Sequence, residues 1–228
     1  MNERFSRAVS IIGEDGLKKL NNASVIVFGL GGVGGAACEA LVRAGVGTLG
    51  IVDKDVVDVT NLNRQLFATE DTIGIPKTEA AQKRLLSINP DLKIEKYNFF
   101  YLPETAHEID LGKYDFVVDC IDNVTAKLEL VEKCNAIGVP IISSMGTGNK
   151  LHPEMLEISD ISKTSVCPLA RVMRRELKKR GIHKLPVVYS KEEPFKTESA
   201  VPGSVSFTPP VAGYLICSYV VRKILNID

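Results

Sequence analysis

The chain has 228 residues, of which 45% are hydrophobic and 25% charged, and its formal net charge at pH 7 is zero. This composition excludes a disordered or collagen-like chain and predicts one globular domain over residues 1–228. A neutral chain has no overall field for nucleic acid, so such a partner would need a local basic patch.

The chain carries no sign of secretion or membrane insertion. Its N-terminus is polar, and its longest apolar tract, residues 211–221, is shorter than the roughly 20 residues of a spanning helix. The five cysteines are scattered, and none forms C-x-x-C. We therefore expect a cytoplasmic protein with no membrane partner, no disulfide framework and no structural zinc.

A glycine-rich stretch after the first apolar run is the strongest signal in the sequence. Residues 25–28 predict a buried strand, and an apolar stripe over residues 33–44 predicts a helix. Between them lies the G-x-G-x-x-G spacing, whose backbone N–H groups and helix dipole favour a phosphate. The glycines concerned are Gly29, Gly31 and Gly34. Gly32 leaves the loop with one side chain fewer.

Strands and helices then alternate. This alternation predicts a fold whose ligands bind beyond the carboxyl ends of the strands. The fold is α/β, with a doubly wound, Rossmann-like, mainly parallel sheet and a core at about residues 20–150. Strands are expected at 48–52, 93–100, 116–118 and 140–144, and helices at 13–20, 77–88, 103–110 and 125–137.

Acidic side chains follow two of these strands. Asp53 ends the second strand, 19 residues after Gly34. That is the place of a carboxylate that holds a ribose hydroxyl, although a turn residue would also fit. Asp55 comes next and has the pattern of a solvated turn residue. Asp122 lies in an acidic cluster after the strand at 116–118.

The last third, at about residues 151–228, predicts a small α+β extension. It contains expected strands at 155–158 and 185–189 and expected helices at 168–180 and 210–225. Five cations lie on one face of the 168–180 helix, opposite an apolar face. Contact with a phosphate backbone and a merely solvated face are both open interpretations. The cations are Arg171, Arg174, Arg175, Lys178 and Lys179.

The motifs together resemble the ubiquitin-activating-enzyme-like superfamily, which includes the ThiF and MoeB adenylyltransferases. The resemblance implies that ATP, with Mg²⁺, adenylates a carboxylate. The matching segments run in the superfamily's order: RFSR at 4–7, GLGGVGG at 29–35, IVDKD at 51–55, NLNRQ at 61–65, GIPK at 74–77, INP at 88–90 and DCIDN at 119–123.

The same resemblance implies roles for individual residues. It implies that Asp53 binds the ribose and that Arg64 and Lys77 bind the phosphates. It also implies that Asp122 holds Mg²⁺ at the adenylation site. Arg7 would reach the ATP of a partner subunit, which implies a homodimer. The remaining cofactor contacts that it implies are Asp55, Asn61, Gln65 and Asn123.

Two features bear on the subfamily. The paired C-x-x-C zinc ligands of many sulfur-carrier activators are absent, and residues 160–182 are similar to the tRNA threonylcarbamoyladenosine dehydratases. Those enzymes activate the carboxylate of a threonine arm on tRNA, and the arm's own urea nitrogen can close the ring. Cys167 is therefore not required as a nucleophile, although its sequence context predicts that it is less buried than the other cysteines.

Two other functions stay open. An activator of a small ubiquitin-like sulfur carrier would act on a protein and would have a sulfur-transfer protein as a candidate partner. An NAD-binding Rossmann protein fits the glycine loop but leaves NLNRQ at 61–65 and GIPK at 74–77 without a role.

Overall fold

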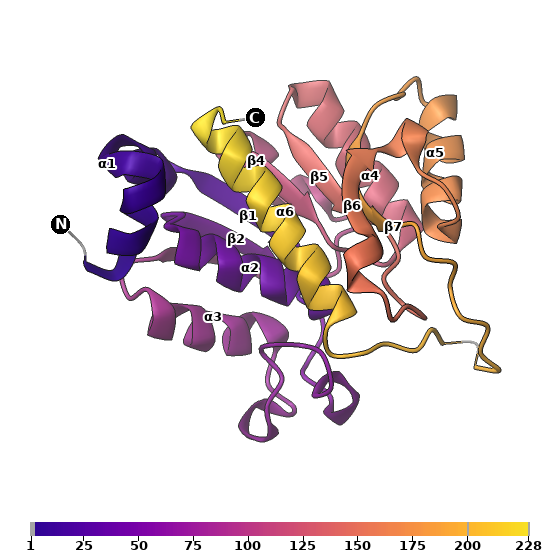
Figure 1. Cartoon of the computed structure of the whole chain (residues 1–228), viewed down its shortest axis with the longest axis horizontal. Coiled ribbons are helices and arrows are strands. Elements are labelled where there is room, and N and C mark those ends of the chain that lie inside the picture. The colour runs from indigo at the N-terminus through magenta and orange to yellow at the C-terminus, as the bar shows by residue number, and fades with distance from the viewer. Residues whose placement is uncertain (1–2, 200, 228) are drawn as a thin grey trace.

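A seven-stranded sheet with helices on both faces forms the body of the protein. It is seen in a computed structural model that describes residues 3–199 and 201–227 (Figure 1). The strand order is β3-β2-β1-β4-β5-β7-β6, and all neighbours pair in parallel except β6 and β7. The strands are β1 (Ser24–Phe28), β2 (Thr48–Val52), β3 (Lys93–Tyr97), β4 (Phe116–Asp119), β5 (Ile141–Ser144), β6 (Leu156–Asp160) and β7 (Pro186–Ser190).

The predicted doubly wound, mainly parallel sheet is thus confirmed. The predicted extension does not form a sheet of its own, because β7 pairs with β5 and places β6 at the edge of the same sheet. The helices are α1 (Ser6–Asn22), α2 (Gly32–Ala44), α3 (Lys77–Ile88), α4 (Val124–Ile137), α5 (Pro168–Lys179) and α6 (Thr208–Leu225).

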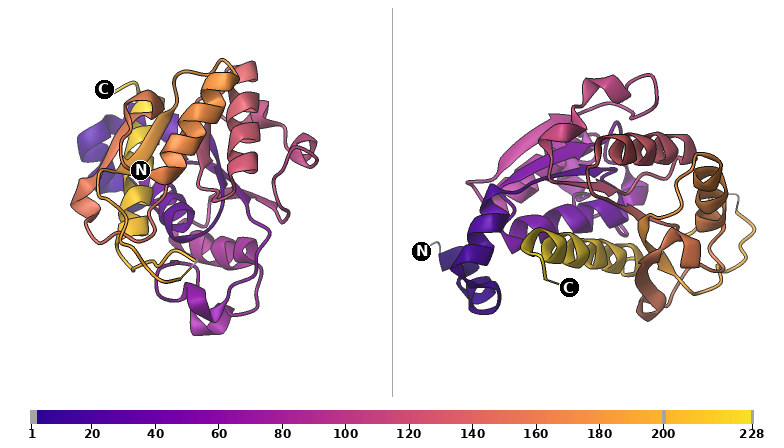
Figure 2. Two further views of the ribbon diagram at one scale, coloured as in Figure 1. Left: turned by 90° about the vertical axis from the view of Figure 1, so that its right-hand side faces the viewer. Right: turned by 90° about the horizontal axis from the view of Figure 1, so that it is seen from above.

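Alternating strand residues separate the two faces of the core. Along β1, Val25 and Val27 pack on the side of α2 and α6, whereas Ile26 and Phe28 pack on the side of α4. In the view from above, α6 lies along α2 on one face of the sheet while α4 covers the other (Figure 2). Gly213 permits this close packing, since a Cβ there would lie 2.4 Å from the Val33 carbonyl oxygen.

Three elements differ from their predicted extent. The first helix begins at Ser6 and kinks at Gly13, where φ is +72°. The third strand ends at Tyr97, level with the end of β2. The helix expected at 103–110 is wrong: a single 3-10 turn, Ala106–Glu108, forms there. Thr105 Oγ1 explains this, because it accepts the Leu102 N–H at 2.9 Å and so competes with helical hydrogen bonds.

Candidate nucleotide-binding site

A cavity of about 370 Å³ lies at the carboxyl ends of β1, β2 and β4. The chain leaves β1 towards β2 on one side and reaches β4 on the other, so this is the point where ligands of such sheets bind. Most of the residues that the sequence singled out line this one cavity, although they are spread over positions 29–122. They are Gly29, Gly31, Gly32, Asp53, Asp55, Asn61, Arg64, Gln65, Lys77 and Asp122.

The glycine loop at one wall is shaped by two close approaches of backbone. Gly29 has φ of +86°, and a Cβ there would lie 2.7 Å from the Cys120 carbonyl oxygen. A Cβ on Gly34 would lie 1.7 Å from the Gly29 carbonyl oxygen. Gly34 therefore lets α2 pack against the loop from behind and does not line the cavity, which leaves the loop itself to face a ligand.

Asp53 joins the glycine loop to the end of β2. Its Oδ2 accepts the Leu30 N–H at 2.6 Å, and its Oδ1 accepts the Asp55 N–H at 2.8 Å. The carboxylate is half-buried at the cavity wall. Its position is fixed by both hydrogen bonds, and its contact with a ribose stays a prediction.

Two cations face the cavity from the segment between β2 and α3. Lys77 is the first residue of α3, and its Nζ lies 3.2 Å from Asp55 Oδ2 with the side chain only 8% exposed. Arg64 Nη1 donates to the carbonyl oxygen of Thr60 and to Asn63 Oδ1, both at 2.9 Å. Both cations are thus held in place without a ligand, an arrangement suited to phosphate oxygens.

Two amide residues of this segment, Asn61 and Gln65, are buried. Asn61 Oδ1 accepts the Asp58 N–H at 3.2 Å and so closes the turn that begins at Val59. Gln65 is also buried and lines the cavity. These two residues support the segment that carries Arg64.

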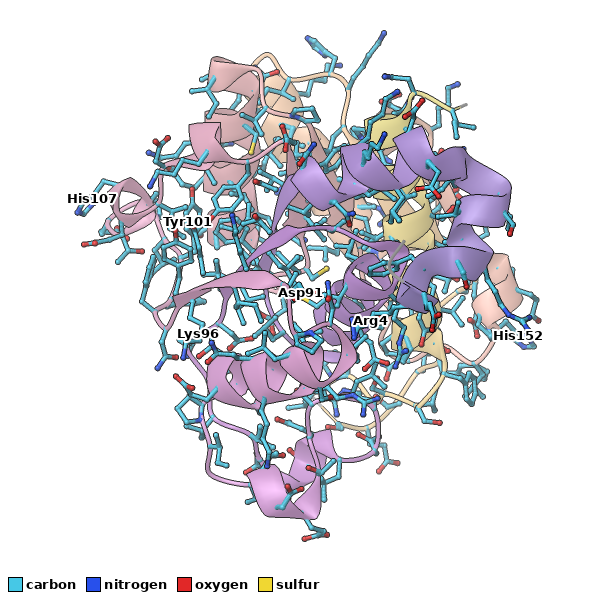
Figure 3. The ribbon with its side chains drawn as sticks, turned by 90° about the vertical axis from the view of Figure 1, so that its left-hand side faces the viewer. Arg4, Asp91, Lys96, Tyr101, His107 and His152 are labelled. Carbon is cyan, nitrogen blue, oxygen red and sulfur yellow. The ribbon has the colours of Figure 1, made fainter. Side chains whose placement is uncertain are left out.

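The opposite wall is aromatic, and the sequence reasoning missed it. Phe99, Phe100 and Tyr101 follow β3 and line the cavity, with Lys54 Nζ 4.9 Å from the centre of the Phe100 ring. Tyr101 is 2% exposed (Figure 3), and burial raises the pKa of its phenol, which stays neutral. Three adjacent aromatic residues beyond a strand end were the available signal, because a flat apolar wall suits a nucleobase.

Residues that follow β5 also reach the cavity. Thr147, Ser204 and Pro209 line it, and the sequence patterns predicted a role in the site for none of them. The segment that carries Ser204 is held by Asn149, whose Oδ1 accepts the Gly203 N–H at 2.6 Å and whose N–H donates to the Gly203 oxygen at 2.8 Å. These contacts join positions far apart in sequence, which is why no local pattern indicated them.

Some expected site residues lie elsewhere. The Asn123 side chain accepts the Ala126 N–H at 3.0 Å and caps α4 instead of lining the cavity. Arg7 is exposed on α1 and is not among the residues that line the cavity of its own chain.

The expectation about cysteine burial is wrong. Cys167 is only 2% exposed, whereas Cys120 is half-buried and lines the cavity. Burial raises the pKa of the Cys120 thiol, and Asp119 raises it further, so this thiol is neutral at ordinary pH. The Cys120 thiol therefore lacks the environment of an activated nucleophile.

The basic face of α5 is less uniform than its spacing indicates. Arg174 is half-buried, and its Nη1 donates to the Thr164 carbonyl oxygen at 2.8 Å and to Thr164 Oγ1 at 2.6 Å. It therefore anchors the loop before α5. Arg175 and Lys179 both pair with Glu176, at 2.9 and 3.0 Å, and stay exposed. The exposed cations of the predicted face are Arg171, Arg175, Lys178 and Lys179.

Within the described ranges, no helix combines the length and apolar character needed to cross a membrane. The same residues contain no group of three or more His, Cys, Asp or Glu side chains arranged to hold a metal ion. A metal at the cavity would therefore need ligands from the nucleotide as well as from the protein.

Comparison with known proteins agrees with this geometry. The family model described as "ThiF family" matches residues 5–228. A tRNA threonylcarbamoyladenosine dehydratase of Bacillus subtilis (strain 168) is 40% identical, over 99% of this chain and 96% of the relative. The E. coli tRNA N6-threonylcarbamoyladenosine dehydratase, solved in complex with ATP, superposes with a TM-score of 0.91 at 31% identity, covering 98% of this chain and 94% of that one.

A sulfur carrier protein adenylyltransferase of Thermus thermophilus is similar over a shorter length. It is 39% identical, but the match covers 61% of this chain and 52% of the relative. By its full-length match to the family model and its overall likeness to the dehydratases, the chain belongs to the ThiF family.

Proposed function

We propose that this protein is an ATP-dependent tRNA threonylcarbamoyladenosine dehydratase that works in the cytoplasm. The observation that carries the proposal is the single cavity that unites the glycine loop, Arg64, Lys77 and Asp122. Its support is the similarity to dehydratases along nearly the whole chain, including the last third. The reaction adenylates the carboxylate of the threonine arm with release of pyrophosphate, and ring closure through the arm's urea nitrogen then releases AMP.

The residues present fit an ATP–Mg²⁺ complex. Magnesium is usually held by one or two carboxylates together with substrate phosphates, and Asp122 offers an exposed carboxylate beside the two cations. Bound ATP and Mg²⁺ would supply the activated phosphoryl group and extra positive charge. Arg64 and Lys77 stabilise the negative charge that develops on phosphate oxygens, and the aromatic wall orients the base.

Two alternatives are weaker. Activation of a sulfur carrier, with a sulfur-transfer protein as partner, is supported by a relative that matches only 61% of the chain. An NAD-binding protein would leave the NLNRQ and GIPK segments, at 61–65 and 74–77, without a role. The ATP complex of the E. coli relative likewise favours ATP over a dinucleotide.

Incubation with ATP and bulk tRNA, followed by nucleoside mass spectrometry, tests the proposal. We expect threonylcarbamoyladenosine to lose the mass of one water, with one AMP and one pyrophosphate formed for each. Omission of ATP or Mg²⁺ is the control and should leave the nucleoside unchanged. Unmodified tRNA together with adenylation of a sulfur-carrier C-terminus would replace this proposal by the first alternative.

We also propose a homodimer in which Arg7 serves the partner's cavity, since Arg7 lies outside the cavity of its own chain. Arg7→Ala and Asp122→Ala should each be inactive alone. After subunit exchange, a mixture should regain about a quarter of the activity, because half of the dimers are mixed and each has one intact site. Pyrophosphate release measures the recovery.

The control for this experiment is the double variant Arg7→Ala/Asp122→Ala mixed with Arg7→Ala. It forms dimers equally well but has no intact combination, so it should stay inactive. An active monomer, or an absence of recovery in dimers shown by light scattering to be mixed, would contradict the arrangement.

We propose that the exposed cations of α5 contact tRNA phosphates. Replacing Arg171, Arg175 and Lys178 by alanine should weaken tRNA binding and leave ATP affinity unchanged, because these residues lie outside the cavity. Each lost phosphate contact should reduce the log–log salt slope of binding by roughly 0.7–0.9. Filter binding at several salt concentrations measures both quantities.

Arg174 is kept in this variant because it anchors the loop at Thr164. A matched control removes three other exposed cations, Lys18, Lys83 and Lys113, and should leave affinity and slope nearly unchanged. Equal effects in the two triple variants would mean that the α5 cations are only a solvated face.

A further inference from the structure

A fully buried ion pair lies beside the cavity and has no part in the site as described so far. Asp119 is the last residue of β4 and Lys127 lies in α4; their Oδ2 and Nζ atoms are 2.8 Å apart, and both side chains are 0% exposed. A buried ion pair adds little net stability, because loss of hydration offsets the attraction between the charges. Stability alone is therefore a poor explanation for its presence.

The hydrogen bonds of this pair converge on the short connection that carries Asp122. Asp119 Oδ1 accepts the Ile121 N–H at 3.1 Å, while its Oδ2 accepts from Lys127 Nζ. The Lys127 N–H donates in turn to the Asn123 carbonyl oxygen at 3.0 Å. The Ile121 N–H, immediately before Asp122, is thus bonded to the ion pair itself, whereas the Asn123 carbonyl is bonded to the backbone of Lys127 in the first turn of α4.

Asp122 itself is exposed at the cavity, in contrast to the pair behind it. An exposed carboxylate on the connection at 120–123 would take several positions if the connection were free. Rates of positioned reactions are sensitive to such freedom, and a displacement of about 1 Å can lower them by about 10²-fold.

We propose that the Asp119–Lys127 ion pair is a positioning device, which locks the connection at 120–123 so that the Asp122 carboxylate points into the nucleotide cavity. The inference rests on the proposed role of Asp122 in adenylation. It assigns to Asp119 and Lys127 an effect on catalysis through Asp122, without contact with the reacting atoms.

Neutralising the pair separates positioning from stability. Lys127→Met leaves a buried carboxylate without its cation and should lower the melting temperature strongly. Asp119→Leu/Lys127→Met has no buried charge, so it should regain most of that loss, but it has no acceptor for the Ile121 N–H. It should therefore show kcat for ATP–pyrophosphate exchange lowered by about 10–10²-fold with KM for ATP nearly unchanged.

Two further measurements do not depend on activity. In the double variant, hydrogen exchange of the peptide covering 119–124 should be faster, and calorimetry should show that ATP affinity depends less on Mg²⁺. The control is Lys133→Met on the same helix, whose side chain is 41% exposed and lies 3.7 Å from Glu129. It should behave as the wild type in every measurement.

The inference would be overturned by a folded double variant that has the wild-type kcat, hydrogen exchange and Mg²⁺ dependence of ATP affinity. If the double variant does not fold, hydrogen exchange of the wild type provides the test: a locked connection should protect the Ile121 amide as strongly as the amides of β4, and rapid exchange there would overturn the inference. If the wild type catalyses no exchange, the proposed function fails, whereas hydrogen exchange and Mg²⁺-dependent ATP affinity still decide the positioning role.

Discussion

Replacing Asp122 by alanine should lower ATP–pyrophosphate exchange by about 10²–10³-fold, because the variant loses the carboxylate that we propose holds Mg²⁺ beside the reacting phosphates. The carboxylate is exposed at the mouth of the cavity and is no part of the core, so the variant stays folded. Isotope exchange between pyrophosphate and ATP measures the loss, and circular dichroism with thermal unfolding checks the fold.

Asp91→Ala is the matched control for this substitution. Asp91 is also exposed but lies outside the cavity, near Arg4 in the view of Figure 3. Its loss should not change exchange. An Asp122→Ala enzyme that exchanges pyrophosphate at the wild-type rate would contradict the proposed role of Asp122 in adenylation.

Gly34→Ala destabilises the protein by more than the ~1–3 kcal/mol typical of an overpacked core, because the added Cβ would lie 1.7 Å from the Gly29 carbonyl oxygen. Neither group is the end of a flexible side chain, so α2 must move away from the glycine loop. A loss of 3 kcal/mol already lowers the melting temperature of a chain of this size by about 6–12 °C. ATP binding is lost as well, because the displaced loop no longer faces a phosphate.

Gly35→Ala is the control one position along the same helix. A Cβ there meets Phe67 at 3.5 Å, an ordinary contact, and alanine is a better helix former than glycine. This variant should be as stable as the wild type or slightly more stable. If Gly34→Ala melted at the same temperature as Gly35→Ala, the close approach of α2 to the loop would be wrong.

Local patterns predicted the sheet and the polar part of the site because each depends on neighbouring residues. The glycine loop, the strand ending at Asp53 and the helix beginning at Lys77 are all encoded within a few positions. The cavity wall made by Phe99–Tyr101 was missed because the third strand was expected to run to Phe100, which would have hidden these rings in a sheet.

Long-range contacts account for most other differences. Arg174 was grouped with the surface cations by its helical spacing, yet a loop ten residues earlier uses it as an anchor. Asn123 lies in a motif of the family but serves as a helix cap. Spacing gives the face of a helix on which a side chain lies, whereas its partner depends on which other segment folds against that face.

The C-terminal helix has a consequence for the order in which the protein can mature during synthesis. Pro209, at the start of α6, forms part of the cavity wall, and Gly213 packs against the Val33 carbonyl at the helix that follows the glycine loop. A nascent chain can pair β1 with β2 early, but its nucleotide cavity stays incomplete until α6 has left the ribosome. The complete cavity thus depends on α6 having packed against α2.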